Sequence, residues 1–471
     1  MLSVVPFPAL PSAPSWFPGH MNRFTKQLPA LLSRTDVVLE LRDSRLPLTS
    51  INNNLEAALR KKNIILVWFQ FHPIIASAVT YVFVILLCLS SVLAPFLCAI
   101  NKWRAERGHH STHAAPLSPT TSGGSSLGYG GPICERIVVL NKRDFVPEWG
   151  VEPFRRAMKA KFPDQTVHFA SCNKPRDIKS LSEMLVNIAK RNPHATEMNV
   201  LVIGMPNVGK STLLNSLRNM GISGRTPKAL QTSAQPGHTR TLSTRLKLSE
   251  DPLVYSYDSP GVMLPFLGRG DRGAERGVKL ALIAGIKESL YDIEGLVAYL
   301  LYRLNVLNPI SPAYLTLLPL GCRPFTDAEE FLEQLAIRLN MLLRGGEKDT
   351  VRAAKWFVEW WRNEGGLASA SVPENLPMGS DGTQAPLLRR GWGFDFEWTV
   401  DGSINSTGGG FESAVQMKME ECIDESIKAA SEDERSGVGI STTQERKRSW
   451  QEKQASRAAK SKAKFAARKA A

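Results

Sequence analysis

The chain has 471 residues, enough for two or three domains with a sizeable core, and a formal net charge of +14 at pH 7. Its six cysteines form no C-x-x-C pair and no zinc-ligand spacing, which argues against structural zinc and indicates a reducing compartment. The positive charge indicates an acidic partner, with nucleic acid as the first candidate.

The first 62 residues are predicted to contain a short leader and the start of a folded domain. Residues 1–14 are interpreted as an N-terminal leader because the first 19 residues contain no acidic residue, although they also lack Lys and Arg. A helix is predicted from about Asn22 to Ser33. Residues 36–43 (D-V-V-L-E-L-R-D) then predict a buried strand that ends in polar residues.

An apolar and low-complexity insertion occupies residues 63–134. Residues 74–94 contain no charged residue, and this length is enough to cross a bilayer. Three interpretations stay open: a transmembrane helix, a translated intron or wrongly assigned exon, and a buried core helix. The insertion separates a helix from the next strand of what should be one sheet, which favours the second interpretation.

The rest of the chain divides by its periodicity. Strands and helices alternate from 137 to 265, which predicts an α/β fold with a parallel sheet. Residues 276–366 have apolar residues at helical spacing and are predicted to be an all-α domain. Residues 368–444 are predicted to be a disordered linker with one aromatic cluster, 392–398. The basic tail 445–471, with ten Lys or Arg and two Glu, is predicted to be disordered, although it is also helix-prone and suited to binding RNA phosphates.

The stretch from Gly204 to Ser211 is a complete G-x4-G-K-S motif between an apolar strand and a helix. Its glycines allow backbone N–H groups to surround phosphates at a helix N-terminus. Lys210 is expected to neutralise β- and γ-phosphate oxygens, and the Ser211 hydroxyl to bind Mg²⁺. The predicted phosphate-binding residues are Asn207, Val208, Gly209, Lys210, Ser211 and Thr212.

An N-K-x-D motif follows directly after the predicted strand 137–140. A carboxylate at this position can accept hydrogen bonds from guanine N1 and N2, a pair of donors that adenine lacks, so the motif predicts GTP as the ligand. Alone it could be a turn that caps a helix, but the phosphate loop in the same chain favours guanine binding. The predicted base-binding residues are Asn141, Lys142, Arg143 and Asp144, with Ser171 and Cys172 in a loop behind the base.

A D-x-x-G motif, Asp258 to Gly261, follows another predicted strand, 253–257. Asp258 is expected to hold Mg²⁺ through water, and the Gly261 N–H to contact the γ-phosphate. Thr239 is the candidate switch threonine, although other Thr residues lie close by. The predicted metal ligands are therefore Ser211, Thr239 and Asp258.

The motifs run from the base motif to the phosphate loop and then to D-x-x-G, whereas Ras-like domains begin at the phosphate loop. The same sheet forms if the N- and C-terminal ends of a Ras-like domain are joined, here through residues 191–198. Residues 15–265 are therefore predicted to be a circularly permuted P-loop GTPase domain interrupted by the insertion. Val262 stands where Ras-like enzymes carry a water-orienting Gln, which predicts slow hydrolysis by the isolated protein. Asn207 is a candidate K⁺ ligand or a residue that hydrogen-bonds within its own loop.

The chain resembles the circularly permuted, ribosome-binding GTPases of the YlqF/RbgA type over roughly 15–62 and 135–366. The resemblance rests on the five nucleotide motifs and on further stretches that include Trp16–Met21 (W-F-P-G-H-M), Glu40–Leu48 (E-L-R-D-S-R-L-P-L) and Tyr299–Leu304 (Y-L-L-Y-R-L). The chain departs from the family in the insertion, in the long tail after 370, and in Asn52–Asn54, which replaces the usual R-N-P.

The resemblance implies a GTPase that is stimulated by the large ribosomal subunit during late assembly in mitochondria, in the matrix or on the matrix face of the inner membrane. It implies that 276–366 contacts rRNA and that a monomer binds rRNA and ribosomal proteins rather than DNA, with peripheral association to the inner membrane allowed. It also implies that His20 assists hydrolysis, so His20, Thr239 and Asp258 are the predicted catalytic residues. Two alternatives stay open: a GTP-binding scaffold with little turnover, and a membrane-integrated GTPase.

Overall fold

A computed structural model describes most of the chain outside the predicted insertion. The described residues are 5–14, 16–52, 55–56, 59, 135–224, most of 227–264, 267–268, 270–364, 367, 389–399, 409–435 and parts of 446–457. The insertion 63–134, and with it the choice among its three interpretations, lies outside these ranges. Among the helices within them, none is long and apolar enough to cross a membrane.

A six-stranded sheet forms the centre of the fold, in the order β3-β2-β1-β4-β6-β5. All neighbouring strands are parallel except β5 and β6. The carboxyl ends of the five parallel strands therefore meet at one edge, where ligands bind in sheets of this kind. The strands are β1 (Val37–Asp43), β2 (Glu135–Asn141), β3 (Thr166–Ala170), β4 (Met198–Gly204), β5 (Leu246–Ser249) and β6 (Val254–Asp258).

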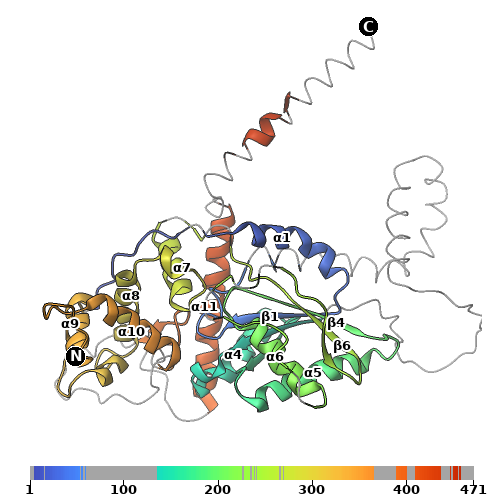
Figure 1. Cartoon of the computed structure of the whole chain (residues 1–471), viewed down its shortest axis with the longest axis horizontal. Helices are drawn as coiled ribbons and strands as arrows, with labels where there is room; N and C mark the ends of the chain where they lie inside the picture. The colour runs from blue at the N-terminus through green and yellow to red at the C-terminus, as the bar shows by residue number, and fades with distance from the viewer. Residues whose placement is uncertain are drawn as a thin grey trace, which may run out of the picture. The chain divides into compact units, whose positions relative to one another are not determined.

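Helices cover both faces of the sheet, whose central strands β1 and β4 are buried along almost their whole length. Figure 1 shows α1 (Gly19–Leu32) on one side of the sheet and α5 (Pro175–Arg191) and α6 (Lys210–Gly221) on the other. The neighbouring residues Val139 and Leu140 point to opposite faces: Val139 packs in the core that contains α5, and Leu140 in the core that contains α4 (Glu148–Lys161).

The order of the elements confirms the predicted permutation. The N-K-x-D motif follows β2, the phosphate loop follows β4 and D-x-x-G follows β6. The strand β1 pairs with β2 on one side and with β4 on the other, so the base motif and the phosphate loop lie one strand apart despite their reversed order.

Four helices follow the GTPase motifs and confirm the predicted all-α region. They share one apolar core with the sheet, since Leu300 and Phe357 belong to the same cluster of buried residues as Val200. The helices are α7 (Gly270–Leu282), α8 (Ile293–Leu307), α9 (Ala328–Arg338) and α10 (Thr350–Asn363).

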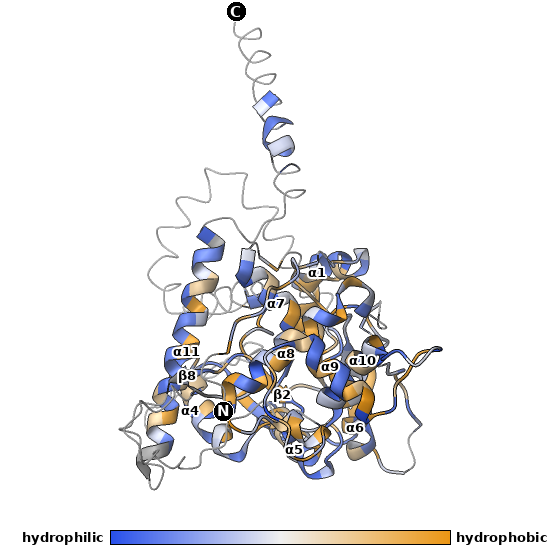
Figure 2. Cartoon of the chain, turned by 90° about the vertical axis from the view of Figure 1, so that its left-hand side faces the viewer, coloured by the Kyte–Doolittle hydropathy of each residue, from blue (hydrophilic) through white to orange (hydrophobic). Residues whose placement is uncertain are grey.

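The prediction of a disordered linker over 368–444 is wrong for residues 389–399 and 409–435. The first stretch contains the short strands β7 (Arg389–Arg390) and β8 (Trp398–Thr399), and the second is the 27-residue helix α11 (Gly409–Arg435). The helix packs on α4 through a buried stripe at positions 415, 419 and 423, and Figure 2 shows the mixture of apolar and polar residues along it. This stripe was not recognised in the sequence because the helix also contains many acidic residues.

The two ends of the chain are described in part. In the predicted leader, Phe7 makes edge contacts with the rings of Tyr299 and Tyr302 on α8. In the basic tail, the described residues between 446 and 457 are helical and exposed. The leader stays a prediction.

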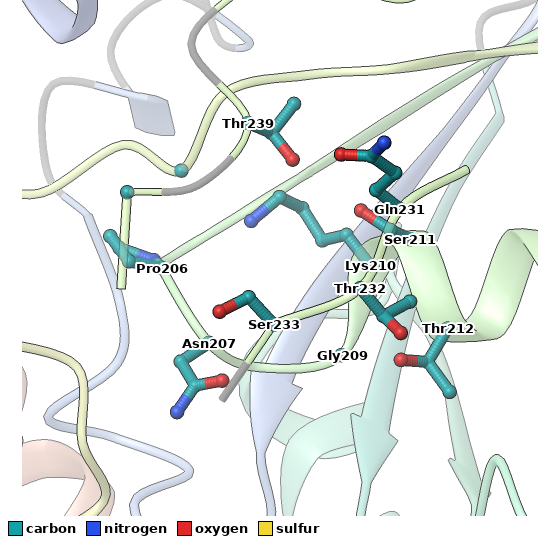
Figure 3. Close-up of a pocket in the computed structure, with 12 residues that line it drawn as sticks. Pro206, Asn207, Gly209, Lys210, Ser211, Thr212, Gln231, Thr232, Ser233 and Thr239 are labelled. Carbon is teal, nitrogen blue, oxygen red and sulfur yellow. The ribbon is translucent and has the colours of Figure 1, made fainter. Parts of the chain in front are cut away.

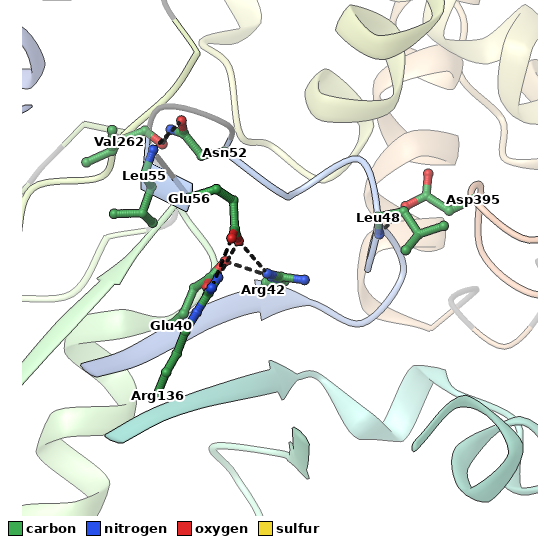
Figure 4. Close-up of polar contacts among 9 residues, drawn as sticks. All are labelled: Glu40, Arg42, Leu48, Asn52, Leu55, Glu56, Arg136, Val262 and Asp395. Carbon is green, nitrogen blue, oxygen red and sulfur yellow. Dashed lines mark hydrogen bonds and ion pairs between the residues drawn. The ribbon is translucent and has the colours of Figure 1, made fainter. Parts of the chain in front are cut away.

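A buried ion network joins β1 to β2. Glu40 accepts from Arg42 Nε at 2.7 Å and from Arg136 Nε at 3.0 Å, and Glu56 accepts from Arg136 Nη1 at 2.9 Å (Figure 4). Burial would raise the pKa of Glu40, but the charges of Arg42 and Arg136 outweigh it and lower this pKa to about 2. The network fixes the pairing of the two strands beside the base motif.

Candidate nucleotide-binding site

The phosphate loop lies between the end of β4 and the start of α6. A side chain on Gly204 (φ +150°) would meet the Leu41 carbonyl oxygen at 2.3 Å, and one on Gly209 (φ +95°) would meet Asn141 Nδ2 at 2.5 Å. Asn207 also has a positive φ of 61°. These constraints fix the loop so that the first N–H groups of α6, which have no partner within the helix, are directed at a bound phosphate.

Lys210 is buried, and its ammonium group lies over the loop that precedes it. Nζ donates to the carbonyl oxygens of Met205 at 2.7 Å and Gly204 at 3.3 Å. Burial lowers the pKa of Lys210 to about 8, and the charge of Asp258 opposes this shift only in part. A phosphate would give this amine the anionic partner that the two carbonyl groups do not supply.

Ser211 and Asp258 form the candidate metal site. Ser211 Oγ donates to Asp258 Oδ2 at 2.5 Å, while Oδ1 of the same carboxylate is buried and has no hydrogen-bond partner among the described residues. Burial raises the pKa of Asp258, although Lys210 and Ser211 oppose the shift. Since Mg²⁺ binds hard oxygen ligands together with phosphate oxygens and water, this hydroxyl and this carboxylate fit the predicted ion.

A pocket collects residues from the phosphate loop and from the segment before β5. Thr239 lines it together with Lys210 and Ser211, as Figure 3 shows. Three polar residues of the pocket were not predicted from the sequence, because they lie in a stretch without periodicity or motif. They are Gln231, Thr232 and Ser233.

The D-x-x-G turn packs directly on the phosphate loop. A side chain on Gly261 would meet Pro206 at 2.7 Å, and Val262 N donates to the Gly204 carbonyl oxygen at 3.0 Å. The Val262 side chain is aliphatic and only 4% exposed. It therefore offers no group that could orient a water molecule.

Asn141 connects the base motif to two other loops. Its Nδ2 donates to the Val208 carbonyl oxygen at 2.7 Å, and its Oδ1 accepts from Cys172 N at 3.3 Å and from the Cys172 thiol at 3.1 Å. Burial raises the pKa of Cys172 to about 12, so the thiol stays a neutral donor. The structure thus brings together the predicted base motif, backing loop and phosphate loop.

Asp144, the predicted guanine reader, is exposed at the same edge of the sheet. Its Oδ1 accepts from Ser171 Oγ at 2.7 Å, which orients the carboxylate. Arg143 points elsewhere, since its guanidinium lies 3.6 Å from carboxylate oxygens of Asp177 and Glu148. Asp144 and Ser171 can therefore bind the base through their side chains, whereas the side chain of Arg143 is engaged with acids of the protein.

Lys142 has a partner that was not predicted as a site residue. Its Nζ donates to Asp43 Oδ2 at 2.8 Å, and Arg45 donates to both oxygens of the same fully buried carboxylate. Burial would raise the pKa of Asp43, but Arg45 and Lys142 hold it below its usual range. Two sequence signals pointed to Asp43: its position at the polar end of a strand and its place in the Glu40–Leu48 stretch that carries the family resemblance.

This chain is similar to several known proteins. The solved structure of GNP-bound YlqF from T. maritima is 17% identical, with a TM-score of 0.39 over 74% of this chain and 97% of that chain. A family model described as "50S ribosome-binding GTPase" matches residues 199–300. "Mitochondrial GTPase 1" of Schizosaccharomyces pombe is 29% identical over 70% of this chain and 81% of that protein. "Mitochondrial ribosome-associated GTPase 1" of Xenopus tropicalis is 28% identical over 69% of this chain and 80% of that protein. The chain is a GTPase.

In this GTPase the predicted catalytic residue His20 lies outside the pocket that contains Lys210. It lines a neighbouring cavity of about 510 Å³ together with Arg23, Thr241 and Pro260. Pro260 belongs to the D-x-x-G motif, so the two cavities share that turn. A role of His20 in hydrolysis stays a prediction.

Proposed function

We propose that this GTPase acts in assembly of the mitochondrial large ribosomal subunit and hydrolyses GTP faster when it is bound to that subunit. Relatives named mitochondrial GTPase 1 and mitochondrial ribosome-associated GTPase 1 support the compartment and the partner. The observation that carries the assignment of the nucleotide site is the hydrogen bond from Asn141 to Val208. It joins the base motif to the phosphate loop across 67 residues of sequence.

Each polar group of the site has a role in this proposal. Asp144 would accept from guanine N1 and N2, and Lys210 would bind the β- and γ-phosphate oxygens. Ser211, Thr239 and Asp258 would hold Mg²⁺, which supplies positive charge between the β- and γ-phosphates.

Hydrolysis by the isolated protein is expected to be slow because Val262 cannot position water. The ribosomal subunit would then act on the D-x-x-G turn, which contacts both the phosphate loop and the cavity that His20 lines. His20 would reach the γ-phosphate side only after a movement of this turn. Asn207, with its positive φ in the phosphate loop, is the proposed K⁺ ligand.

The helical region is the proposed rRNA contact. Exposed basic side chains lie at the last residue of α9, in the turn that follows it and in the first half of α10, where phosphates can reach them. The basic tail would add further phosphate contacts. The exposed basic residues of α9 to α10 include Arg338, Arg344, Arg352 and Lys355.

The test is multiple-turnover GTP hydrolysis by the purified GTPase with large subunits, with small subunits, or alone, in K⁺ and in Na⁺. We expect roughly tenfold or greater stimulation by large subunits only, a larger rate in K⁺, and no activity in Lys210→Ala. His20→Ala should lose stimulation and keep nucleotide affinity.

Two surface variants separate the ribosome contact from the nucleotide site. Arg344→Ala with Arg352→Ala should weaken binding to large subunits and leave the unstimulated rate unchanged, whereas Arg155→Ala on α4 serves as the matched control. If phosphate release never exceeds one turnover with large subunits, the GTP-binding scaffold is the correct alternative. Equal stimulation by both subunits would contradict the proposed partner.

A further inference from the structure

Residues 389–399, for which no function was predicted, lie on the loop that follows β1. We call residues 389–399 the C-terminal clamp and residues 43–50 the β1 loop. Asp395 Oδ2 accepts from Leu48 N at 2.8 Å (Figure 4). The same oxygen accepts from Thr49 N at 2.8 Å, and Oδ1 accepts from the Thr49 hydroxyl. The Asp395 side chain is only 3% exposed. One buried carboxylate therefore satisfies three donors of the β1 loop.

Three neighbours of Asp395 continue the contact. Trp392 Nε1 donates to the Ser44 carbonyl oxygen at 3.0 Å, and Phe394 N donates to the Arg45 carbonyl oxygen at 3.2 Å. Gly393 has a φ of +58°, and a side chain there would meet the Arg45 oxygen at 2.3 Å. The clamp thus follows the β1 loop closely from Ser44 to Thr49.

The opposite side of the β1 loop holds the base motif. Ser44 N donates to the Asn141 carbonyl oxygen at 3.0 Å, and Ser44 Oγ donates to the Lys142 carbonyl oxygen at 2.7 Å. The Asp43 carboxylate holds the Lys142 ammonium at 2.8 Å. Lys142 itself has a positive φ of 65°, a strained backbone conformation that needs support from its surroundings.

The clamp also has anchors outside the β1 loop. Arg303 on α8 donates to the carbonyl oxygens of Gly393 at 3.0 Å and Phe396 at 2.7 Å, and it forms an ion pair with Glu397. Trp392 and Phe396 are buried in the apolar cluster that α4 and α11 share. The clamp is therefore a fixed support on which the β1 loop and the base motif rest.

From this chain of contacts we infer that Asp395 is a positioning residue for guanine recognition, acting through the β1 loop on Lys142. The inference rests on the assignment of the N-K-x-D motif to the base in the proposed function. Because the clamp holds the β1 loop, and through it Lys142, in one arrangement, its loss lowers affinity for the guanine nucleotide.

A double-mutant cycle on GDP affinity tests this inference, with a fluorescent GDP analogue as the probe. Asp395→Asn replaces one acceptor oxygen by an amide that cannot accept, and we expect GDP to bind about tenfold more weakly. In a Lys142→Ala background the same change should alter affinity less than twofold. A merely structural role of Asp395 would instead reduce affinity by the same factor in both backgrounds.

Two further variants guard against a folding defect. Thr49→Val removes one donor to Asp395 and should weaken GDP binding about threefold, again only when Lys142 is present. Asp424→Asn makes the same charge change on an exposed residue of α11 and should leave GDP affinity unchanged. Thermal unfolding without nucleotide identifies a variant that fails to fold.

The outcomes separate this inference from the proposed function. If Lys142→Ala alone leaves GDP affinity unchanged, the assignment of the base motif fails. The positioning role of Asp395 is refuted if Lys142→Ala weakens GDP binding but Asp395→Asn and Thr49→Val do not. It is also refuted if the effects of these two changes are equal in both backgrounds. In either case the assignment of the base motif is kept.

Discussion

The phosphate side and the base side of the nucleotide site differ in how far their polar groups are already paired. On the phosphate side, Lys210 rests on carbonyl groups of its own loop, and Asp258 Oδ1 has no partner among the described residues. On the base side, the side chains of Asn141, Lys142 and Asp144 all have hydrogen-bond partners within the protein. The phosphate side therefore gains its interactions from the ligand, whereas the base side is organised by the protein in advance.

The largest expected effect is on ligand binding at the phosphate side. Lys210→Met should weaken GDP and GTP binding by roughly a thousandfold, because the β- and γ-phosphates lose their buried positive partner. Without nucleotide, the free energy of unfolding should change little, since the cost of burying the Lys210 charge is removed together with its partial compensation by Asp258. Titration with a labelled nucleotide and urea denaturation measure both quantities. A large loss of stability in the nucleotide-free protein would contradict the proposed difference between the phosphate side and the base side.

The reverse is expected on the base side. Asp43→Asn should lower the free energy of unfolding of the nucleotide-free protein by about 3 kcal/mol, because Arg45 and Lys142 would lose their shared buried carboxylate. Urea denaturation measures it, with the exposed Asp164→Asn as the matched control. Stability equal to that of the control would show that this network contributes nothing to folding.

A pH series sharpens the contrast further. In the nucleotide-free protein the pKa of Lys210 is lowered to about 8, so its charged form, which the phosphates require, is lost as pH rises through 8. GDP should therefore bind about tenfold more weakly at pH 9 than at pH 7, with uptake of about one proton at pH 9. Calorimetry in two buffers of different ionisation enthalpy measures this uptake. Constant affinity without proton uptake would contradict the lowered pKa.

The smallest effect is expected on the surface of α11. Arg156 and Glu412 lie 3.1 Å apart and are half exposed, so Arg156→Ala should change the free energy of unfolding by less than about 0.5 kcal/mol. Met419→Ala, which truncates a fully buried residue of the same helix, should lower it by about 3 kcal/mol. Urea denaturation of both variants shows whether apolar packing or ion pairs hold α11 on α4.

Local patterns predicted the phosphate side better than the base side. The motif from Gly204 to Ser211 is contiguous, and its strand and helix are its immediate neighbours, so a short window contains all the information. The pairing of Asp43 with Lys142 depends instead on the register of β1 and β2, which are separated by more than 90 residues. No short window of the sequence contains that register.

The C-terminal clamp was missed for the same physical reason. Its aromatic residues were visible as a cluster, but Trp392 and Asp395 find their partners about 347 residues earlier in the chain. The composition around the cluster, rich in Gly, Ser and acids, is typical of linkers and carried more weight than one short apolar stretch. The circular permutation, by contrast, followed from motif order alone and needed no long-range contact.

The contact between Glu56 and Arg136 has a practical consequence for editing this gene. Because these side chains are in contact, Glu56 and the start of β2 at Glu135 lie near each other, and the cost of closing the loop between them rises only slowly with its length. Removal of codons 63–134 would leave residues 57–62 to join Glu56 to Glu135. A fluorescent reporter inserted at this point would take the place of residues 63–134 and would change no strand. We expect this junction to tolerate such a change better than a site within β1 or β2, because no strand residue is removed.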